Sequence, residues 1–426
     1  MQARSFAVFA VTVACCAQAA AQTKSGLDTT TFIVMGEGLS AGMANFGLSS
    51  AFQNFSFPAQ AAAQMKTAMV QPLIQPPGIG DVVGYPGQEV RLQTYPQGSV
   101  RQFYTVPPSL VASPPIFIEN LSVPGLTLAD SISLRPVAPI AQHSMKQTVV
   151  NMILGFPQLF LDNVPLWSQF EYAKGMFPTV TLIELGYYEA LDAAVNLDPA
   201  RLPDPNTFGT AYGSIIAGLR GLQSQVIATT IPNPLDNAYF SSPATAASIT
   251  ATDPFVITAG YNVTPQDYLT RNALMTIANQ FSNGAIAPLP LGSILTGATA
   301  AALTIRINAL NAQILSAAKT NGAVVYDLAA FLHKIKVTGA SAGTSTITAD
   351  YLGGFYSLDA VYPGPTGNAL IANDFLTFLN TTYQKSFPLI TVPGVSSVDP
   401  VATFRKPQGR FHTAHSLGLP ESGLTQ

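Results

Sequence analysis

The sequence predicts an α/β fold, a three-layer α/β/α sandwich with a mainly parallel central sheet and long loop insertions. Short apolar runs without polar alternation are typical of strands buried on both faces. An amphipathic helix pattern lies between two such runs, and strand, helix and strand in this order indicate a right-handed crossover. The length of 426 residues suits one large domain or two small ones, and a hydrophobic content of 48% is enough to bury a large core.

The predicted strands follow one another along the chain as apolar runs. The first is Thr31 to Met35 (TFIVM), and Ile116 to Ile118 is a weaker candidate. Val180 to Leu185 (VTLIEL) and Val226 to Ile231 (VIATTI) have the same apolar character, and the last run is Val324 to Tyr326. Such runs are expected where helices cover both faces of a sheet.

One helix is predicted in detail, just before the last strand. Its apolar face is marked by residues at spacings of four, three and four, namely Leu303, Ile307, Leu310 and Ile314. The pair Asn321-Gly322 predicts the end of this helix, because glycine readily adopts the left-handed conformation of a C-terminal cap.

The charge content excludes some classes of partner. Only 10% of residues are charged, against roughly 25% in an average domain. The net charge of −3 disfavours nucleic acid as a partner, because phosphate binding needs concentrated Lys and Arg. After the N-terminal segment no apolar stretch is long enough for a transmembrane helix. The composition predicts no particular oligomeric state.

The N-terminus predicts export. Residues 1–21 combine an early Arg, an apolar run and A-x-A sites ending at Ala19 or Ala21, the pattern of a cleaved signal peptide. We therefore expect a secreted or periplasmic bacterial protein. Cys15 and Cys16 raise lipoprotein anchoring as an alternative, although Thr12 stands where a lipobox has Leu. Both cysteines lie in this segment, so the mature chain has no disulfide.

The remaining chain is predicted to hold one domain over residues 28–390. Pro-, Gln- and Gly-rich stretches at about 50–115 and 232–298 are expected as loop insertions, forming either a lid or surface packing. The tail over residues 391–426 is expected to be an extended strap or partly disordered.

Four motifs occur in an order that resembles the SGNH (GDSL) esterase and lipase family. They are GEGLSAG at 36–42, ENLSVPGLTLAD at 119–130, ELGYYEALDAA at 184–194 and SLDAVYPGPTGNALIANDF at 357–375. The resemblance covers about residues 30–385 and implies a flavodoxin-like SGNH-hydrolase fold. It also implies acyl transfer to a serine, with a histidine base, an acid, and donors for an oxyanion.

Carried over by position, the catalytic set is incomplete. The resemblance assigns the nucleophile to Gly38, the oxyanion asparagine to Tyr188 and the base to Tyr362, so all three are lost. It assigns the oxyanion glycine to Gly125 and the triad acid to Asp359, and these two are retained. The set therefore predicts a chain that is inactive as a serine esterase by the family's template.

Few residues are candidates to replace the missing nucleophile, base and oxyanion donor. Ser40 is a candidate displaced nucleophile, although a hydroxyl that caps the helix start is the alternative. Tyr362 is a poor base because a phenol is protonated at neutral pH. Tyr188 either donates to an oxyanion or bounds the cleft as a half-buried aromatic ring. The histidines lie outside the motifs, at His143, His333, His412 and His415.

A second interpretation rests on carboxylates and aromatic rings. Glu37, Glu189 and Asp359 are expected near the carboxyl edge of the sheet, either as acid–base or metal-binding groups or as structural carboxylates that hold loops. Tyr187, together with the tyrosines at 188 and 362, is expected to line an aromatic cleft around Gly38. No metal and no cofactor are expected.

These observations predict an exported SGNH-like pseudoenzyme that binds a small apolar or acylated ligand in the old ester-binding cleft. One alternative is an active carboxylester hydrolase or lipase with a rearranged site. A second alternative is a non-catalytic structural protein of the bacterial envelope, which the low charge and neutral polar surface would suit.

Overall fold

The computed structural model describes residues 26–76, 78–80, 82, 117–138, 144–155, 166–397, 399 and 401. Its centre is a parallel sheet in the order β1-β2-β3-β7. These strands are β1 (Phe32–Gly36), β2 (Val180–Glu184), β3 (Gln225–Thr229) and β7 (Val324–Tyr326). The predicted α/β class with a mainly parallel central sheet is therefore confirmed.

The strand register brings Gly36 and Glu184, the last residues of β1 and β2, to the same edge of the sheet. β1 and β2 pair from Phe32 with Val180 to Gly36 with Glu184, so both strands end side by side. On the other side of β1, the Val34 N–H donates to Glu119 O at 2.9 Å and the Leu121 N–H donates to Val34 O at 2.9 Å. Residues 117 and 118 of the weak strand candidate are not a strand, and just after them Asn120 forms an isolated parallel bridge with Val34.

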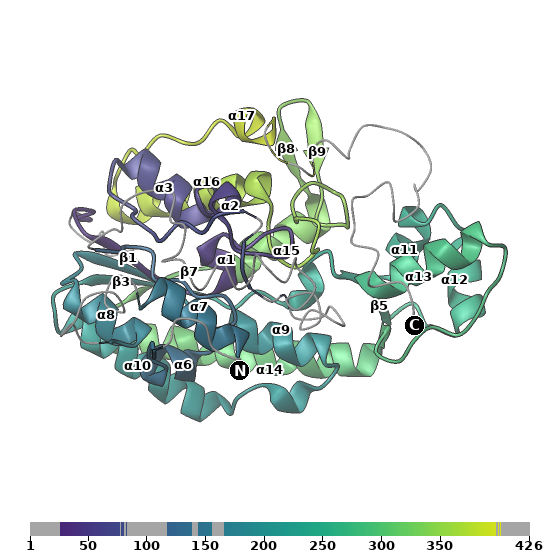
Figure 1. The fold of residues 1–426 in the computed structure, drawn as a ribbon, viewed down its shortest axis with the longest axis horizontal. Helices are drawn as coiled ribbons and strands as arrows, with labels where there is room; N and C mark the ends of the chain where they lie inside the picture. The colour runs from purple at the N-terminus through teal and green to yellow at the C-terminus, as the bar shows by residue number, and fades with distance from the viewer. Residues whose placement is uncertain are drawn as a thin grey trace, which may run out of the picture.

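Helices cover both faces of this sheet (Figure 1). One face carries α8 (Gln169–Gly175), α10 (Pro205–Arg220) and α14 (Gly297–Asn321), and the other carries α3 (Phe57–Met65) and α16 (Pro365–Tyr383). The remaining helices near the site are α1 (Gly38–Ala41), α2 (Ser50–Gln53), α6 (Leu128–Ser133), α7 (Met145–Ile153), α9 (Tyr187–Val195) and α15 (Leu328–Thr338). Helices on both faces explain why the strands read as continuous apolar runs.

The long helix α14 follows its sequence pattern closely. Leu303, Ile307, Leu310 and Ile314 are all buried. The helix ends at Asn321, and Gly322 caps it with φ of 68°. The Gly322 N–H donates to the Ala318 carbonyl, which would otherwise lack a hydrogen-bond partner at the end of the helix.

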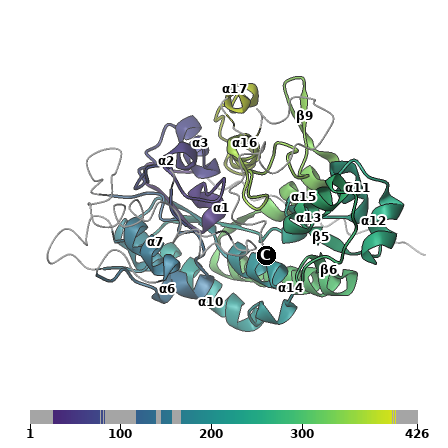
Figure 2. The same cartoon turned by 45° about the vertical axis from the view of Figure 1, so that its right-hand side comes forward.

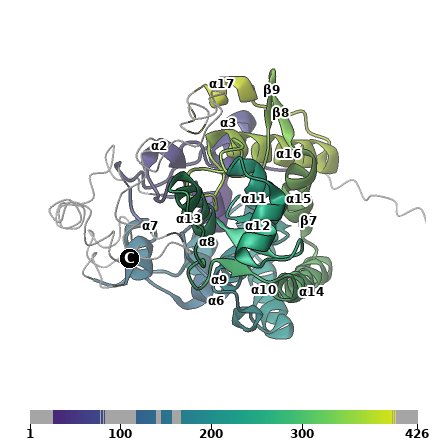
Figure 3. The same cartoon turned by 90° about the vertical axis from the view of Figure 1, so that its right-hand side faces the viewer.

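A second folded unit occupies most of the range 232–298. It contains the three-stranded sheet of β4 (Phe240–Ser241), β5 (Tyr268–Thr270) and β6 (Ile294–Leu295). Around the sheet lie α11 (Pro243–Ile249), α12 (Pro254–Tyr261) and α13 (Arg271–Ser282), at one end of the molecule (Figures 2 and 3). Nine buried apolar residues, including Ile257, Leu269 and Ile277, form a separate core here.

Two other expected irregular segments also carry packed structure. Within 50–115, α3 packs on α16, where the rings of Phe57 and Phe375 meet edge to face with centroids 6.3 Å apart. Within the tail, α17 (Val392–Ser396) contacts α16, and the buried Asp399 carboxylate accepts the Thr366 N–H at 2.9 Å. The hairpin of β8 (Ala340–Ala342) and β9 (Ser345–Ile347) lies beside α17. The predicted signal peptide and the tail after 401 lie outside the described residues.

Over the part of the chain that the structure describes, no helix combines the length and apolarity that a membrane crossing requires.

Candidate functional site

The candidate site lies where β1 and β2 end and where α1 and α9 begin. Glu37 is the N-cap of α1, and its Oε1 accepts the Leu39 N–H at 2.8 Å. After β2 the chain turns through Gly186, with φ of 106°, into α9. A Cβ at Gly186 would stand 2.6 Å from Ile231 Cδ1, so both backbone conformation and space require glycine there.

The Glu37 carboxyl is the centre of the site. It is wholly buried, and the Tyr362 hydroxyl donates to its Oε2 at 3.1 Å. Burial raises the pKa of Glu37 to about 7, while hydrogen bonding to the backbone of Leu39, Gly38 and Gly125 opposes that rise. The glycine that the family resemblance assigns to the oxyanion hole thus faces a carboxyl of the protein itself.

The Tyr362 ring fills the space that a nucleophile at position 38 would need. A Cβ on Gly38 would stand 2.6 Å from Tyr362 Cζ and 2.7 Å from its Cε1 and hydroxyl oxygen. Tyr362 and Tyr187 are both buried, and their rings meet edge to face with centroids 6.4 Å apart. The expected open aromatic cleft around Gly38 is therefore wrong, because these two tyrosines pack together and close it.

Asp359 is buried and serves the backbone. Its Oδ1 accepts the N–H groups of Val361 at 2.8 Å and Tyr362 at 2.9 Å. Its Oδ2 accepts the Phe46 N–H at 3.3 Å. Burial raises the pKa of Asp359, and these N–H groups oppose that rise. In this structure Asp359 orders the turn that carries Tyr362.

Ser40 is held by side chains from two other segments. Its Oγ lies 2.9 Å from Glu184 Oε2 and 2.9 Å from Ser122 Oγ, and the residue is wholly buried. The local backbone contact expected for a helix-start hydroxyl, to Glu37 O, is longer at 3.5 Å. Ser40 therefore links α1 to β2 and to the segment beside β1.

Glu184 is the site residue that the sequence interpretation missed. Its Oε2 accepts the backbone N–H groups of Ser40 at 3.2 Å and Glu37 at 3.3 Å, in addition to the Ser40 hydroxyl. Burial, and then the nearby charge of Glu37, raise its pKa well above the ordinary value. The sequence does contain a sign of its importance, because Glu184 is a charged residue at the end of an otherwise apolar buried strand.

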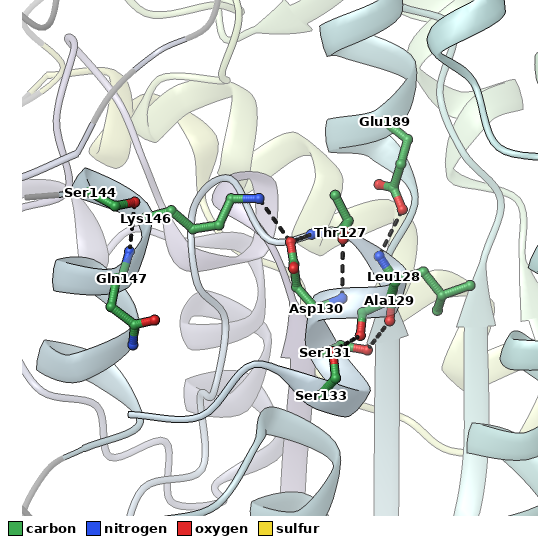
Figure 4. Close-up of polar contacts among 10 residues, drawn as sticks. All are labelled: Thr127, Leu128, Ala129, Asp130, Ser131, Ser133, Ser144, Lys146, Gln147 and Glu189. Atoms are coloured by element: carbon green, nitrogen blue, oxygen red, sulfur yellow. Dashed lines mark hydrogen bonds and ion pairs between the residues drawn. The ribbon is translucent and has the colours of Figure 1, made fainter. Parts of the chain in front are cut away.

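Polar contacts connect α6, α7 and α9 at the margin of the site (Figure 4). Glu189 of α9 points toward the start of α6, where its Oε1 accepts the Leu128 N–H at 2.7 Å, and burial raises its pKa to about 7. Lys146 of α7 pairs with Asp130 at 2.8 Å and lies 5.4 Å from the centre of the Tyr188 ring.

Tyr188 bounds this margin as a half-buried ring. Its Cε2 lies 3.7 Å from the position of a Cβ on Gly125, whose φ is 81°. The Tyr188 ring thus lies beside Gly125, with the Lys146 ammonium group over the ring.

His333 is the histidine within the described residues, and its polar partner lies outside this group of side chains. His333, on α15, places its Nδ1 at 3.1 and 3.2 Å from the two carboxylate oxygens of Asp236, and its side chain is 66% exposed. His143, His412 and His415 lie outside the described residues. Across the described ranges, no group of three or more His, Cys, Asp or Glu residues is arranged to hold a metal ion.

The carboxylates of the site serve mainly to stabilise the backbone rather than to activate a nucleophile. Each of Glu37, Glu189 and Asp359 accepts at least one backbone N–H, as the structural interpretation of these carboxylates expected. Acyl transfer to a hydroxyl needs an accessible nucleophile beside a base. Ser40 has a carboxyl partner but is wholly buried, and position 38 carries no side chain.

Comparisons with known proteins give distant likenesses only. No family model and no curated protein matches the chain. Among solved structures it is similar to psychrotrophic esterase EstA from Pseudoalteromonas sp., with 10% identity and a TM-score of 0.35 over 84% of this chain and 100% of the esterase. It is also similar to LAE5, an alpha/beta hydrolase enzyme from the metagenome of Lake Arreo, with 11% identity and a TM-score of 0.35 over 83% and 96%.

A third similar structure is phospholipase A1 from Streptomyces albidoflavus NA297. It has 12% identity and a TM-score of 0.34, over 83% of this chain and 100% of the phospholipase. TM-scores of this size establish neither a family nor an activity for the chain.

Proposed function

We propose that this chain is an exported, non-hydrolytic protein built on the plan of the SGNH hydrolases. One observation carries the proposal: the Tyr362 hydroxyl donates to the Glu37 carboxyl at 3.1 Å, and the Tyr362 ring lies over Gly38. By the family resemblance, Tyr362 stands at the histidine position, and its ring fills the space of a side chain at the serine position, Gly38.

The size of the catalytic loss supports this proposal. Removing the serine or the histidine of a hydrolase triad lowers turnover by on the order of a million-fold. Here both positions are replaced, and Tyr188 stands at the position of the oxyanion asparagine. The Gly125 N–H, the retained donor, is directed at the Glu37 carboxyl.

We still predict an apolar or acylated ligand, and we place its binding site at the margin of the cleft instead of at the centre. The space beside Gly38 is filled by the Tyr362 ring. The half-buried Tyr188 ring and the partly exposed Lys146, which pairs with Asp130 and lies 5.4 Å from the ring centre, would contact a ligand such as a fatty-acid carboxylate. Decanoate should raise the melting temperature of the wild type and not of a Tyr188→Ala variant.

Hydrolysis of short- and long-chain aryl esters tests the proposed function. We expect the wild type, Ser40→Ala and Tyr362→Phe all to give the rate of the buffer alone. A wild-type rate well above buffer that disappears in Ser40→Ala would establish the alternative, a carboxylester hydrolase with a rearranged site. A background rate together with no response to decanoate would instead favour a structural envelope protein.

A further inference from the structure

The helix α14 presents a stripe of exposed residues on the side opposite its buried face. The members recur at spacings of four, three, four, three and four, namely Ala301, Ile305, Asn308, Ala312, Leu315 and Lys319, and we call them the α14 stripe. This spacing places all of them on one face of the helix, each beside the next along its axis. Ile305 and Leu315 are 69% and 52% exposed, so two large apolar side chains project into solvent from the same face.

The helix α10 lies beside α14 at the outer edge of the molecule and runs in the same direction (Figure 3). Arg306 Nη2 donates to the Leu202 carbonyl at 2.8 Å, just before α10 begins, and Gln313 Oε1 lies 2.5 Å from where a Cβ would stand on Gly209. The two helices border a groove of about 500 Å³, with an uncharged lining that includes Thr210, Gly213, Ser214, Ser316 and Ala317. Because Ser316 directly follows Leu315, the groove runs beside this end of the α14 stripe.

The two ends of this pair of helices differ in the sign of their charge. The end where α10 begins carries three aspartates and two arginines, namely Asp192, Asp198, Asp204, Arg201 and Arg306. At the other end the charged residues of the two helices are Arg220 and Lys319. Between Asp204 and Arg220 the sequence of α10 has no charged residue, and α14 has none between Arg306 and Lys319. The face is therefore acidic at one end, neutral in the middle and basic at the other end.

We propose that a second copy of the chain docks on this face, with its α14 antiparallel to that of the first copy. Ile305 and Leu315 lie at equal distances along the sequence on either side of Leu310. A twofold axis beside Leu310 therefore places Ile305 of each copy against Leu315 of the other. Asn308 and Ala312 pair in the same way, and their short side chains let the two helices approach each other.

The distribution of charge favours a second copy in this orientation. Antiparallel docking puts the acidic end of each copy against the basic end of the other, so both ends of the interface are attractive. A parallel arrangement would place like charges together at both ends. The same docking brings the Ile305 side chain of one copy to the end of the stripe where the uncharged groove of the other copy runs. Apolar contacts and charges thus select one and the same arrangement.

Sedimentation velocity over a wide range of protein concentration tests this proposal. The full chain is used in the form in which cells produce it. The variants Ile305→Asp and Leu315→Arg each place a charge against an apolar side chain of the second copy. The matched controls are Val337→Asp and Leu389→Arg, which change apolar residues of 67% and 52% exposure on other elements. Circular dichroism checks that all four variants are folded.

We expect the wild type and both controls to form the same dimer, which weakens as salt rises because its ends attract through charge. Ile305→Asp alone and Leu315→Arg alone should each raise the dissociation constant of the dimer by at least about tenfold, because an unpaired charge is then buried. An equal mixture of these two variants should pair again. In the mixed dimer the new carboxylate faces the new guanidinium group, and the second contact of Ile305 with Leu315 stays intact.

Three results would overturn the proposal. The first is a wild type that remains monomeric at millimolar concentration. The second is a dimer that neither Ile305→Asp nor Leu315→Arg weakens. The third is a dimer that both variants abolish but that does not return in their mixture, which would contradict the antiparallel pairing. None of these results depends on whether the chain hydrolyses esters.

Discussion

At the scale of single residues, the site is explained by two residues, Gly38 and Tyr362, that fit each other. A tyrosine at 362 reaches over position 38, and only a residue without a side chain leaves room for its ring. The hydroxyl of the same tyrosine then satisfies one oxygen of the buried Glu37 carboxyl. Gly38 and Tyr362 therefore depend on each other, and a serine at 38 or a histidine at 362 alone should not create a working site.

The first prediction concerns this dependence. Gly38→Ala should lower the free energy of unfolding by about 1–3 kcal/mol, because its Cβ overlaps the packed Tyr362 ring. In a Tyr362→His background, Gly38→Ala should lower the free energy of unfolding much less, since the smaller imidazole ring leaves space. Urea unfolding of the four proteins of this double-mutant cycle measures the coupling. Equal costs in both backgrounds would show that the two positions are independent.

The stability of the fold should depend on pH through the buried carboxyls of Glu37 and Glu189. Burial raises the pKa of Glu37 and of Glu189 to about 7, from an ordinary value of 4.5. The folded state therefore holds more protons than the unfolded state between about pH 4.5 and 7, and stability falls as pH rises through this window. The wild type should unfold at higher urea at pH 5.5 than at pH 8. Glu37→Gln should flatten this dependence; an unchanged slope would contradict the assignment.

At the scale of elements, side-chain amides and carboxylates attach loops to helices. Asn311, inside α14, accepts the Ile231 N–H at 2.7 Å through Oδ1 and donates to Ile231 O at 2.9 Å through Nδ2. Ile231 is buried and follows β3, close to Gly186. This pair of bonds fixes the loop that packs against the entry to α9.

The third prediction tests that attachment. Asn311→Ala should lower the free energy of unfolding by about 2–4 kcal/mol, because it leaves two buried backbone groups of Ile231 without their partner. Asn308→Ala, at an exposed position of the same helix, is the control and should be neutral or slightly stabilising. Thermal unfolding of both variants compares them directly. A loss below about 1 kcal/mol for Asn311→Ala would mean that water replaces the lost bonds.

Elements with strong periodicity could be predicted, and elements stabilised by distant contacts could not. The apolar runs of β1, β2, β3 and β7 and the buried stripe of α14 are local patterns, and they match the structure. The unit with α11, α12 and α13 was expected as an insertion of loops, because its strands are two or three residues long. Such strands leave no alternation to detect, and their core forms only in three dimensions.

At the scale of the whole molecule, motif order predicted which segments meet. Residues 37, 40, 184 and 362 lie in three of the four motifs, and the fold brings their side chains into contact. The sequence did not predict that the site is closed, because that depends on how Tyr187 and Tyr362 pack. The importance of Glu184 was likewise hidden, since its partners lie more than 140 residues away.

The central claim is that the chain holds no reactive serine at the ends of β1 and β2. The most direct test is intact mass after incubation with an alkyl fluorophosphonate, which forms a stable bond with an activated serine hydroxyl. We predict no adduct, because position 38 has no hydroxyl and Ser40 is buried beside Glu184. Stoichiometric labelling that maps to Ser40 and disappears in Ser40→Ala would contradict the account and establish a working hydrolase site.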